Sequence, residues 1–191
     1  PIPKQYCRLT GDRSMLEATL PRIGPLVGPP RTLAIVNRDH LALAADQLRT
    51  LPPANVLVQP RNCDTGPGLL FALLRLARRD PRATVAVFPS DHFVREDRSF
   101  LEHVVQGIDV VRRFPPKVVV LGITPDRGEP GLGYLELGRP LRGPRSQGAF
   151  PVTAFVEKPD REMAEEIVRR GGLWNSFVMV FRLETMLAIL R

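Results

Sequence analysis

Short apolar runs rich in β-branched residues recur along the first two thirds of the chain and are bounded by Gly, Pro or polar residues. Continuous runs of this kind are typical of strands that are buried on both faces of a parallel sheet. Four of them predict strands over residues 32–36, 55–58, 84–88 and 117–121.

Between these runs, apolar residues repeat at the i, i+3, i+4, i+7 spacing that gives a helix one apolar face. Ser14 followed by Glu17 predicts a capping box at the start of a further helix. The alternation of strands and helices indicates an α/β fold with a Rossmann-like open, mostly parallel sheet and helices on both faces. The helical sets are Leu41, Ala44, Ala45 and Leu48; Leu70, Leu73, Leu74 and Ala77; and Leu101, Val104, Val105 and Ile108.

The second part of the chain changes character from about residue 122, where Gly and Pro become frequent. Isolated strands are expected over 133–137, 152–156 and 176–181, a helix from Asp160 to Gly171, and a surface loop over 138–148. We expect this part to form a subregion laid against the first within one domain over residues 1–191.

Length and composition fit a chain with one hydrophobic core, since 43% of the 191 residues are hydrophobic. Cys7 and Cys63 have no metal-ligand spacing and are expected to be structural thiols. No apolar run approaches the roughly 20 residues of a membrane span, and the N-terminus does not resemble a secretory signal. We therefore expect a cytoplasmic protein that does not engage membranes.

The charge balance is strongly basic, at +7, which is compatible with nucleic-acid binding. However, the arginines are scattered along helical segments and only 6% of residues are aromatic, so no basic stripe with stacking rings is present. A solvated basic surface and no nucleic-acid partner is the favoured interpretation. Lysine occurs only at positions 4, 117 and 158, which suggests sites where a compact point charge matters.

Candidate chemistry follows the predicted strands, because ligands bind at the carboxyl ends of strands in an open parallel sheet. Pro89-Ser90-Asp91-His92 follows the strand over 84–88, and Asp91 could hold Mg²⁺ against phosphate oxygens or form an ordinary turn. Residues 59–68 open a helix whose first amides could face an anion, or make a turn and cap. Neither a Walker loop nor a GxGxxG motif is present.

A second group of candidates lies toward the C-terminus. Glu157 and Lys158 leave a predicted strand together, where Glu could accept hydrogen bonds from sugar hydroxyls and Lys could hold a phosphate. A salt-bridged strand end is the alternative. Asn175 after Trp174 puts an amide at the start of the next strand, where it could read a pair of hydroxyls.

Taken in order, these segments resemble the motifs of the sugar-1-phosphate nucleotidyltransferase family, most of all its mannose-1-phosphate guanylyltransferase branch. The likeness covers nearly the whole chain. Its motifs are Pro3-Lys4-Gln5 with Leu9, Gly11 and Ser14; residues 62–70; Pro89-Ser90-Asp91-His92; Gly131 to Glu136; Phe155 to Asp160; and Trp174-Asn175-Ser176.

The resemblance implies a nucleotide-diphospho-sugar transferase fold, with a nucleotide-binding half over 1–121 and a sugar-phosphate-binding half over 122–191. It implies transfer of GMP from GTP to mannose 1-phosphate with release of pyrophosphate. Mg²⁺ would be held by Asp91, and Lys4 and Asp91 would be the catalytic residues. The nucleotide-binding residues would be Gln59, Asn62, Thr65, Gly66, Ser90 and Asp91, and the sugar-phosphate-binding residues Gly133, Glu157, Lys158 and Asn175.

The chain also departs from the family pattern. The glycine-rich signature loop is expected before Pro1 and a second metal carboxylate after Arg191, so residues 1–191 alone are expected to turn over little. Asp64, Gly66, Gly68 and Phe177 differ from the usual residues; the change at Asp64 bears on guanine preference, and Phe177 on how the sugar pocket closes. Two alternatives stay open: another sugar phosphate or nucleotide, and a catalytically silent regulatory subunit that binds nucleotide sugars. A homodimer is compatible with either.

Overall fold

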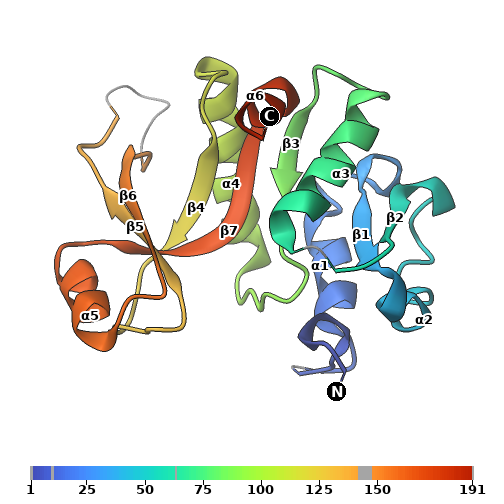
Figure 1. The fold of residues 1–191 in the computed structure, drawn as a ribbon, viewed down its shortest axis with the longest axis horizontal. Helices are drawn as coiled ribbons and strands as arrows, with labels where there is room; N and C mark the ends of the chain where they lie inside the picture. The colour runs from blue at the N-terminus through green and yellow to red at the C-terminus, as the bar shows by residue number, and fades with distance from the viewer. Residues whose placement is uncertain (1, 10, 63, 142–147, 191) are drawn as a thin grey trace. The chain divides into compact units, whose positions relative to one another are not determined.

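The computed structural model describes residues 2–9, 11–62, 64–141 and 148–190, and these group into two compact units (Figure 1). The first unit comprises Pro1–Ala83, Pro89–Leu101 and Met186–Arg191. The second comprises Thr84–Phe88 and Glu102–Thr185.

The first unit is built around two parallel strands that pair from Ala34↔Val56 to Asn37↔Gln59. Its hydrophobic cluster contains buried side chains from η1, α1, β1 and the segment around α2. The elements are η1 (Lys4–Tyr6), α1 (Met15–Ile23), η2 (Pro29–Arg31), β1 (Ala34–Asn37), η3 (Arg38–His40), α2 (Leu41–Ala44), η4 (Pro53–Asn55), β2 (Val56–Gln59), α3 (Thr65–Ala77) and the start of α4 (Asp97–Arg113). The cluster consists of Tyr6, Leu16, Val36, Ala44, Leu48 and Leu51.

Helix α1 begins at the predicted capping box, which the structure confirms. The Ser14 amide donates to Glu17 Oε2 at 2.8 Å, and the Glu17 amide donates to Ser14 Oγ at 3.1 Å. The Ser14 hydroxyl also donates to Gln47 Oε1 at 2.6 Å, so one buried side chain caps α1 and ties it to the segment after α2.

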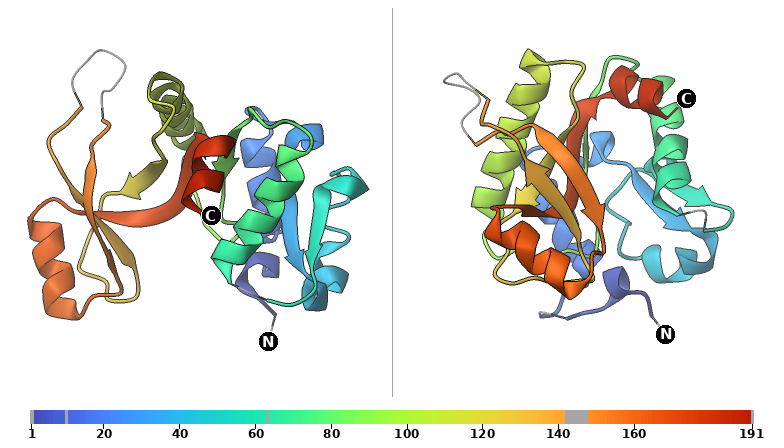
Figure 2. Two further views of the ribbon diagram at one scale, coloured as in Figure 1. Left: turned by 45° about the horizontal axis from the view of Figure 1, so that its top comes forward. Right: turned by 60° about the vertical axis from the view of Figure 1, so that its left-hand side comes forward.

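The second unit contains a five-stranded sheet in which β7 pairs antiparallel with β3, β4 and β5, and β5 pairs antiparallel with β6. Helix α5 packs beside β5 and β6 (Figure 2), where Tyr134, Ala164 and Ile167 are fully buried and Val156 and Trp174 pack against them. The elements are β3 (Thr84–Val87), most of α4, β4 (Val119–Ile123), β5 (Gly133–Leu137), β6 (Val152–Glu157), α5 (Arg161–Arg169), β7 (Leu173–Arg182) and the start of α6 (Leu183–Ile189).

The α/β class predicted from the sequence is confirmed, while the mostly parallel sheet is confirmed only in part. Among the described strands, β1 and β2 are the one parallel pair. Strand β7 lies between β3 and β4 and pairs antiparallel with both. A continuous apolar run indicates burial on both faces but does not identify the neighbouring strand, and that explains the difference.

Two local expectations were wrong. Strand β7 begins at Leu173, so Asn175 lies inside the strand and not at its start. Helix α2 has only four residues, and of its predicted apolar set only Ala44 and Leu48 are buried. One buried pair gives a helix little tertiary support, and short helices depend on such support.

Some expectations concern residues that the structure does not describe. Cys7 is a free thiol, as expected, whereas Cys63 and residues 142–147 of the predicted surface loop lie outside the described residues. Within the described ranges, no helix is both long and apolar enough to cross a membrane. The functional division at residue 121 remains a prediction.

Candidate functional site

The predicted nucleotide-binding segment joins the end of β2 to the start of α3 in the first unit. Gln59 is the last residue of β2, and its carboxamide lies across the first turn of α3. A Cβ added to Gly68 would approach Gln59 Nε2 to 2.7 Å, so a larger residue there would displace the Gln59 carboxamide. The structure therefore brings Gln59 to the N-terminal end of α3, where helix amides have no partner in a preceding turn.

The loop between Gln59 and α3 has an unusual backbone. Asn62 Oδ1 accepts a hydrogen bond from the Asp64 amide at 3.1 Å, and Asp64 has φ 63° and ψ −173°, a region that is almost confined to glycine. The Asp64 carboxylate makes no capping hydrogen bond, although Asp is a favoured N-cap residue. Asn62, Thr65 and Gly66 are exposed beside it. The segment thus presents polar side chains and free helix amides to solvent.

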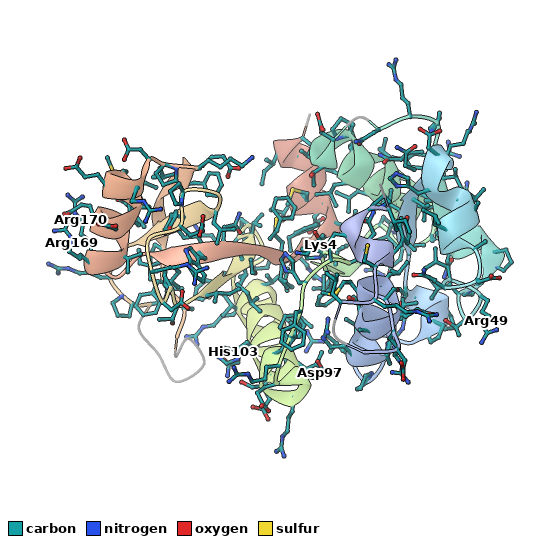
Figure 3. The ribbon with its side chains drawn as sticks, turned by 90° about the horizontal axis from the view of Figure 1, so that it is seen from below. Lys4, Arg49, Asp97, His103, Arg169 and Arg170 are labelled. Atoms are coloured by element: carbon teal, nitrogen blue, oxygen red, sulfur yellow. The ribbon has the colours of Figure 1, made fainter. Side chains whose placement is uncertain are left out.

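The predicted catalytic pair, Lys4 and Asp91, also belongs to the first unit, together with Ser90. Lys4 is exposed on η1 (Figure 3), and the Asp91 side chain is 43% exposed with Oδ1 4.0 Å from His92 Nε2. Burial lowers the pKa of His92, the Asp91 charge raises it, and the charges of Lys4 and Arg22 lower it further. Lys4 and Asp91 therefore share the electrostatic environment of His92.

Arg22 is a residue of this environment that the sequence analysis did not identify. Its side chain is only 6% exposed; Nε donates to Asp97 Oδ1 at 2.7 Å and Nη1 donates to Thr19 Oγ1 at 3.4 Å. Asp97, labelled in Figure 3, is the first residue of α4. Arg22 lies on the buried face of α1 with Met15 and Thr19. A charged residue at a core-facing position of a predicted helix is the sequence feature that could have drawn attention to it.

The predicted sugar-phosphate residues lie in the second unit, where strand register places three of them in one row. Asn175 pairs with Gly122 on one side, and Gly133 pairs with Glu157. Since Tyr134 pairs with Trp174, Gly133 lies next to Asn175. The row therefore runs Gly122, Asn175, Gly133 and Glu157 across β4, β7, β5 and β6, and we call it the cross-strand row.

Directly paired residues of antiparallel strands project from the same face of the sheet. Tyr134, Val156 and Trp174 face α5 in the buried cluster. Because successive residues alternate between faces, the cross-strand row projects from the face opposite α5. The row has a glycine on each side of Asn175, and neighbouring side chains lie close over both: Leu173 at Gly122, and Glu157 with Phe155 at Gly133.

Gly133 lies beneath two side chains of the neighbouring strand β6. A Cβ added there would lie 2.8 Å from Glu157 Oε2 and 3.1 Å from two ring atoms of Phe155. The Glu157 carboxylate and the exposed Phe155 ring therefore lie over Gly133, and any larger residue would displace them. Phe155 was not predicted as a site residue; its position two residues before Glu157, on the same strand face, was the available signal.

Asn175 and Lys158 complete this group. Asn175 Oδ1 accepts the Phe177 amide at 2.9 Å, which leaves its Nδ2 group as a donor. Lys158 Nζ lies 3.8 Å from Glu157 Oε1, and both side chains are largely exposed. Exposed ion pairs of this length contribute little to stability, so the lysine is available to a phosphate.

The arrangement of possible metal ligands bears on the predicted role of Asp91. Across the described ranges, no three or more His, Cys, Asp or Glu side chains gather in a group that could hold a metal ion. Asp91, the predicted ligand, offers one carboxylate. This fits Mg²⁺, which commonly binds through one or two carboxylates and takes its other ligands from substrate phosphates and water.

Comparison with known proteins places these observations in a family. The family model described as "Nucleotidyl transferase" matches residues 2–189. Mannose-1-phosphate guanylyltransferase 2 of Escherichia coli O157:H7 is 32% identical over 99% of the chain and 40% of its own length. Xanthan biosynthesis protein XanB of Xanthomonas campestris pv. campestris (strain B100) is 34% identical over 99% of the chain and 39% of its own length. The chain thus spans about two fifths of the length of these relatives.

A solved structure agrees with the sequence comparison. A Thermus thermophilus structure titled mannose-1-phosphate geranyltransferase superposes with a TM-score of 0.88 at 34% identity, over 99% of this chain and 53% of that one. A Helicobacter pylori structure titled mannose-6-phosphate isomerase superposes with a TM-score of 0.79 over 97% of this chain and 68% of that one; its 24% identity supports the fold alone.

Proposed function

The chain belongs to the nucleotidyl transferase family. We propose that it is part of an enzyme that transfers GMP from GTP to mannose 1-phosphate and makes GDP-mannose. In this reaction a phosphate oxygen of the sugar phosphate forms a bond to the α-phosphorus of GTP. The bond from that phosphorus to the bridging oxygen breaks, and pyrophosphate leaves. The observation that carries the proposal is the cross-strand row, in which Asn175 and Glu157 lie on the two strands that flank Gly133.

On the nucleotide side, residues 59–66 provide the groups that a nucleoside triphosphate needs. The first amides of α3, at Thr65 and Gly66, can donate to an anion at the positive end of the helix. The side chains of Gln59 and Asn62 offer donors and acceptors for a purine edge. Ser90, next to Asp91, adds a hydroxyl beside the phosphates.

At the reacting centre, the protein's task is alignment and charge neutralisation. The attacking oxygen is already anionic, so no general base is required. The lowered pKa of His92 favours its neutral form, and Lys4 and Arg22 supply the positive charge in its surroundings. Lys4 is exposed and can contact the phosphates directly, whereas Arg22 is held by Asp97.

Divalent metal use is general in this family. Asp91 would hold Mg²⁺ together with substrate phosphate oxygens. When bound, the ion supplies neutralisation of negative charge on the phosphates.

On the sugar side, the cross-strand row offers complementary groups. The Glu157 carboxylate accepts hydrogen bonds from hydroxyls, and Asn175 Nδ2 donates to them. Lys158 follows Glu157 and holds the phosphate as a point charge. A vicinal pair of hydroxyls bridges the two side chains across Gly133.

A second candidate keeps the chemistry but changes the substrate, because Asn175 and Glu157 suit hydroxyl pairs of several hexoses. Asp64, in the predicted base-binding segment, has a strained backbone. A nucleotide other than GTP is therefore the second part of this candidate. The alternative of a silent regulatory subunit, a homodimeric assembly and a cytoplasmic location remain predictions from the sequence.

The proposal is tested with the complete gene product, incubated with GTP, mannose 1-phosphate and Mg²⁺ while GDP-mannose is followed by chromatography. The wild type is expected to form GDP-mannose, and Asp91→Asn to lose at least about 100-fold in rate. Asp109→Asn, which changes an exposed carboxylate on α4, is the matched control and keeps full activity. Absence of any nucleotide sugar in the wild-type reaction would contradict the proposal.

A further inference from the structure

Strand β7 contains an irregularity beside the cross-strand row. Val120 pairs with Met179 and Gly122 pairs with Asn175, so Leu121 alone faces three residues of β7, namely 176–178. The Ser176 hydroxyl donates to the Leu121 carbonyl oxygen at 2.6 Å and accepts from the Val178 amide at 3.1 Å. The β7 bulge, residues 176–178, is thus fixed by side-chain hydrogen bonds. Bulges of this kind often re-aim a side chain next to a functional site.

Phe177, in the middle of this bulge, has an unfavourable backbone conformation. Its φ is 59°, in the left-handed region, where a bulky L-residue is a clear outlier. Glycine would adopt the same conformation without this cost. The Asn175 side chain stabilises it by accepting the Phe177 amide at 2.9 Å.

Phe177 is more exposed than its two neighbours in the bulge. Ser176 and Val178, on either side, are buried, whereas Phe177 is 37% exposed. A residue that strains the backbone and directs part of its ring to solvent indicates a functional constraint. The constraint acts next to Asn175, a residue of the cross-strand row.

We propose that Phe177 is a specificity-determining residue of the sugar-phosphate site, whose ring packs against the C–H face of the bound hexose while Asn175 and Glu157 bind its hydroxyls. This inference rests on the proposed function of the cross-strand row. A hexopyranose has hydroxyls around its rim and C–H groups on its faces. The electron-rich face of an aromatic ring attracts such C–H groups and buries apolar surface against them.

The ring therefore selects ligands that possess a sugar face, beyond what Lys158 gains from the phosphate alone. Inorganic phosphate, which has no such face, is bound by the charged group and not by Phe177. This difference provides an internal reference for the experiment, because a general disturbance of the site would weaken both ligands.

The test uses the complete gene product and measures KM for mannose 1-phosphate, KM for GTP, and inhibition by inorganic phosphate competing with mannose 1-phosphate. Phe177→Leu, which keeps apolar bulk but removes the ring, is expected to raise KM for mannose 1-phosphate about 3- to 10-fold, the range of a lost aromatic contact. KM for GTP and the inhibition constant of phosphate stay unchanged. Phe177→Tyr, which keeps the ring, stays within about twofold of the wild type.

Phe150→Leu serves as the matched control, because Phe150 is 40% exposed in the same unit and lies outside the row.

A second pair of variants tests the backbone: Phe177→Gly and Phe177→Ala both remove the ring, but only glycine relieves the left-handed conformation. The glycine variant is expected to melt about 2–4 °C above the alanine variant. Equal melting temperatures would show that the left-handed conformation does not exist in solution and would overturn the inference.

The failure of this inference can be separated from failure of the proposed function. If the wild type makes GDP-mannose and Phe177→Leu has an unchanged KM for mannose 1-phosphate, Phe177 has no role in sugar binding and the proposed function stands. If calorimetry detects no binding of mannose 1-phosphate to the wild type, both fail. A parallel loss of sugar-phosphate and phosphate affinity in Phe177→Leu would assign the residue a structural role only.

Discussion

Gly133 offers a sharp test of the cross-strand row, because one added methyl group acts directly on Glu157. In Gly133→Ala the new Cβ would lie 2.8 Å from Glu157 Oε2 and 3.1 Å from the Phe155 ring, so both side chains must move. Both contacts are to the ends of side chains, and the backbone need not shift. Alanine also lowers the conformational entropy of the unfolded chain, which stabilises the folded protein by about 0.4–1 kcal/mol. We expect the free energy of unfolding to change by no more than about 1 kcal/mol.

The effect on ligand binding is expected to be larger. A displaced Glu157 loses a hydrogen bond between a charged carboxylate and a sugar hydroxyl, which is worth about 1.5–3 kcal/mol. This corresponds to a rise of about 10- to 150-fold in KM for the sugar phosphate. Steady-state kinetics with the complete gene product would measure it, and KM for GTP should stay the same.

Gly131→Ala is the control for this substitution, since its added Cβ would meet only Glu129 Oε1 at 3.5 Å, an ordinary contact. Urea unfolding of both variants would separate stability from binding. An unchanged KM for sugar phosphate in Gly133→Ala would refute the assignment of the row, as would an equal rise in both KM values.

Two further predictions concern the first unit. Ser14→Ala removes both the cap of α1 and the hydrogen bond to Gln47, and is expected to cost about 1–2 kcal/mol of unfolding free energy in urea titrations; a loss below about 0.5 kcal/mol would contradict this account. Because the pKa of His92 is lower in the folded protein than its ordinary 6.5, the unfolded chain binds this proton first as the pH falls. The associated stability is therefore complete above about pH 6.5 and declines as the pH drops through the folded pKa, and urea titrations from pH 8 to 5 should show a shallower decline for His92→Gln than for the wild type.

Local patterns predicted most strands well, because β-branched apolar runs have few alternatives to a buried strand. The segment 133–137 coincides with β5, and the segment 152–156 falls one residue short of β6. Helix starts marked by side-chain caps, at Ser14 and Asp160, were also identified. The position of β7 between β3 and β4 was not predicted, because pairing partners depend on tertiary contacts and not on the local apolar pattern.

The site shows the same limit. Order and spacing of motifs selected Glu157 and Asn175 as candidates, but only strand register reveals that Gly122 and Gly133 flank Asn175. The left-handed backbone of Phe177 depends on a bulge that no periodic pattern predicts.

The central claim, nucleotidyl transfer to a sugar 1-phosphate, is tested most directly by pyrophosphate release. The complete gene product would be incubated with Mg²⁺, mannose 1-phosphate and each of the four common nucleoside triphosphates in turn. We predict release that requires the sugar phosphate and occurs with GTP. No release with any nucleotide, across a panel of hexose 1-phosphates, would contradict the account and favour a regulatory subunit that binds nucleotide sugars without turnover.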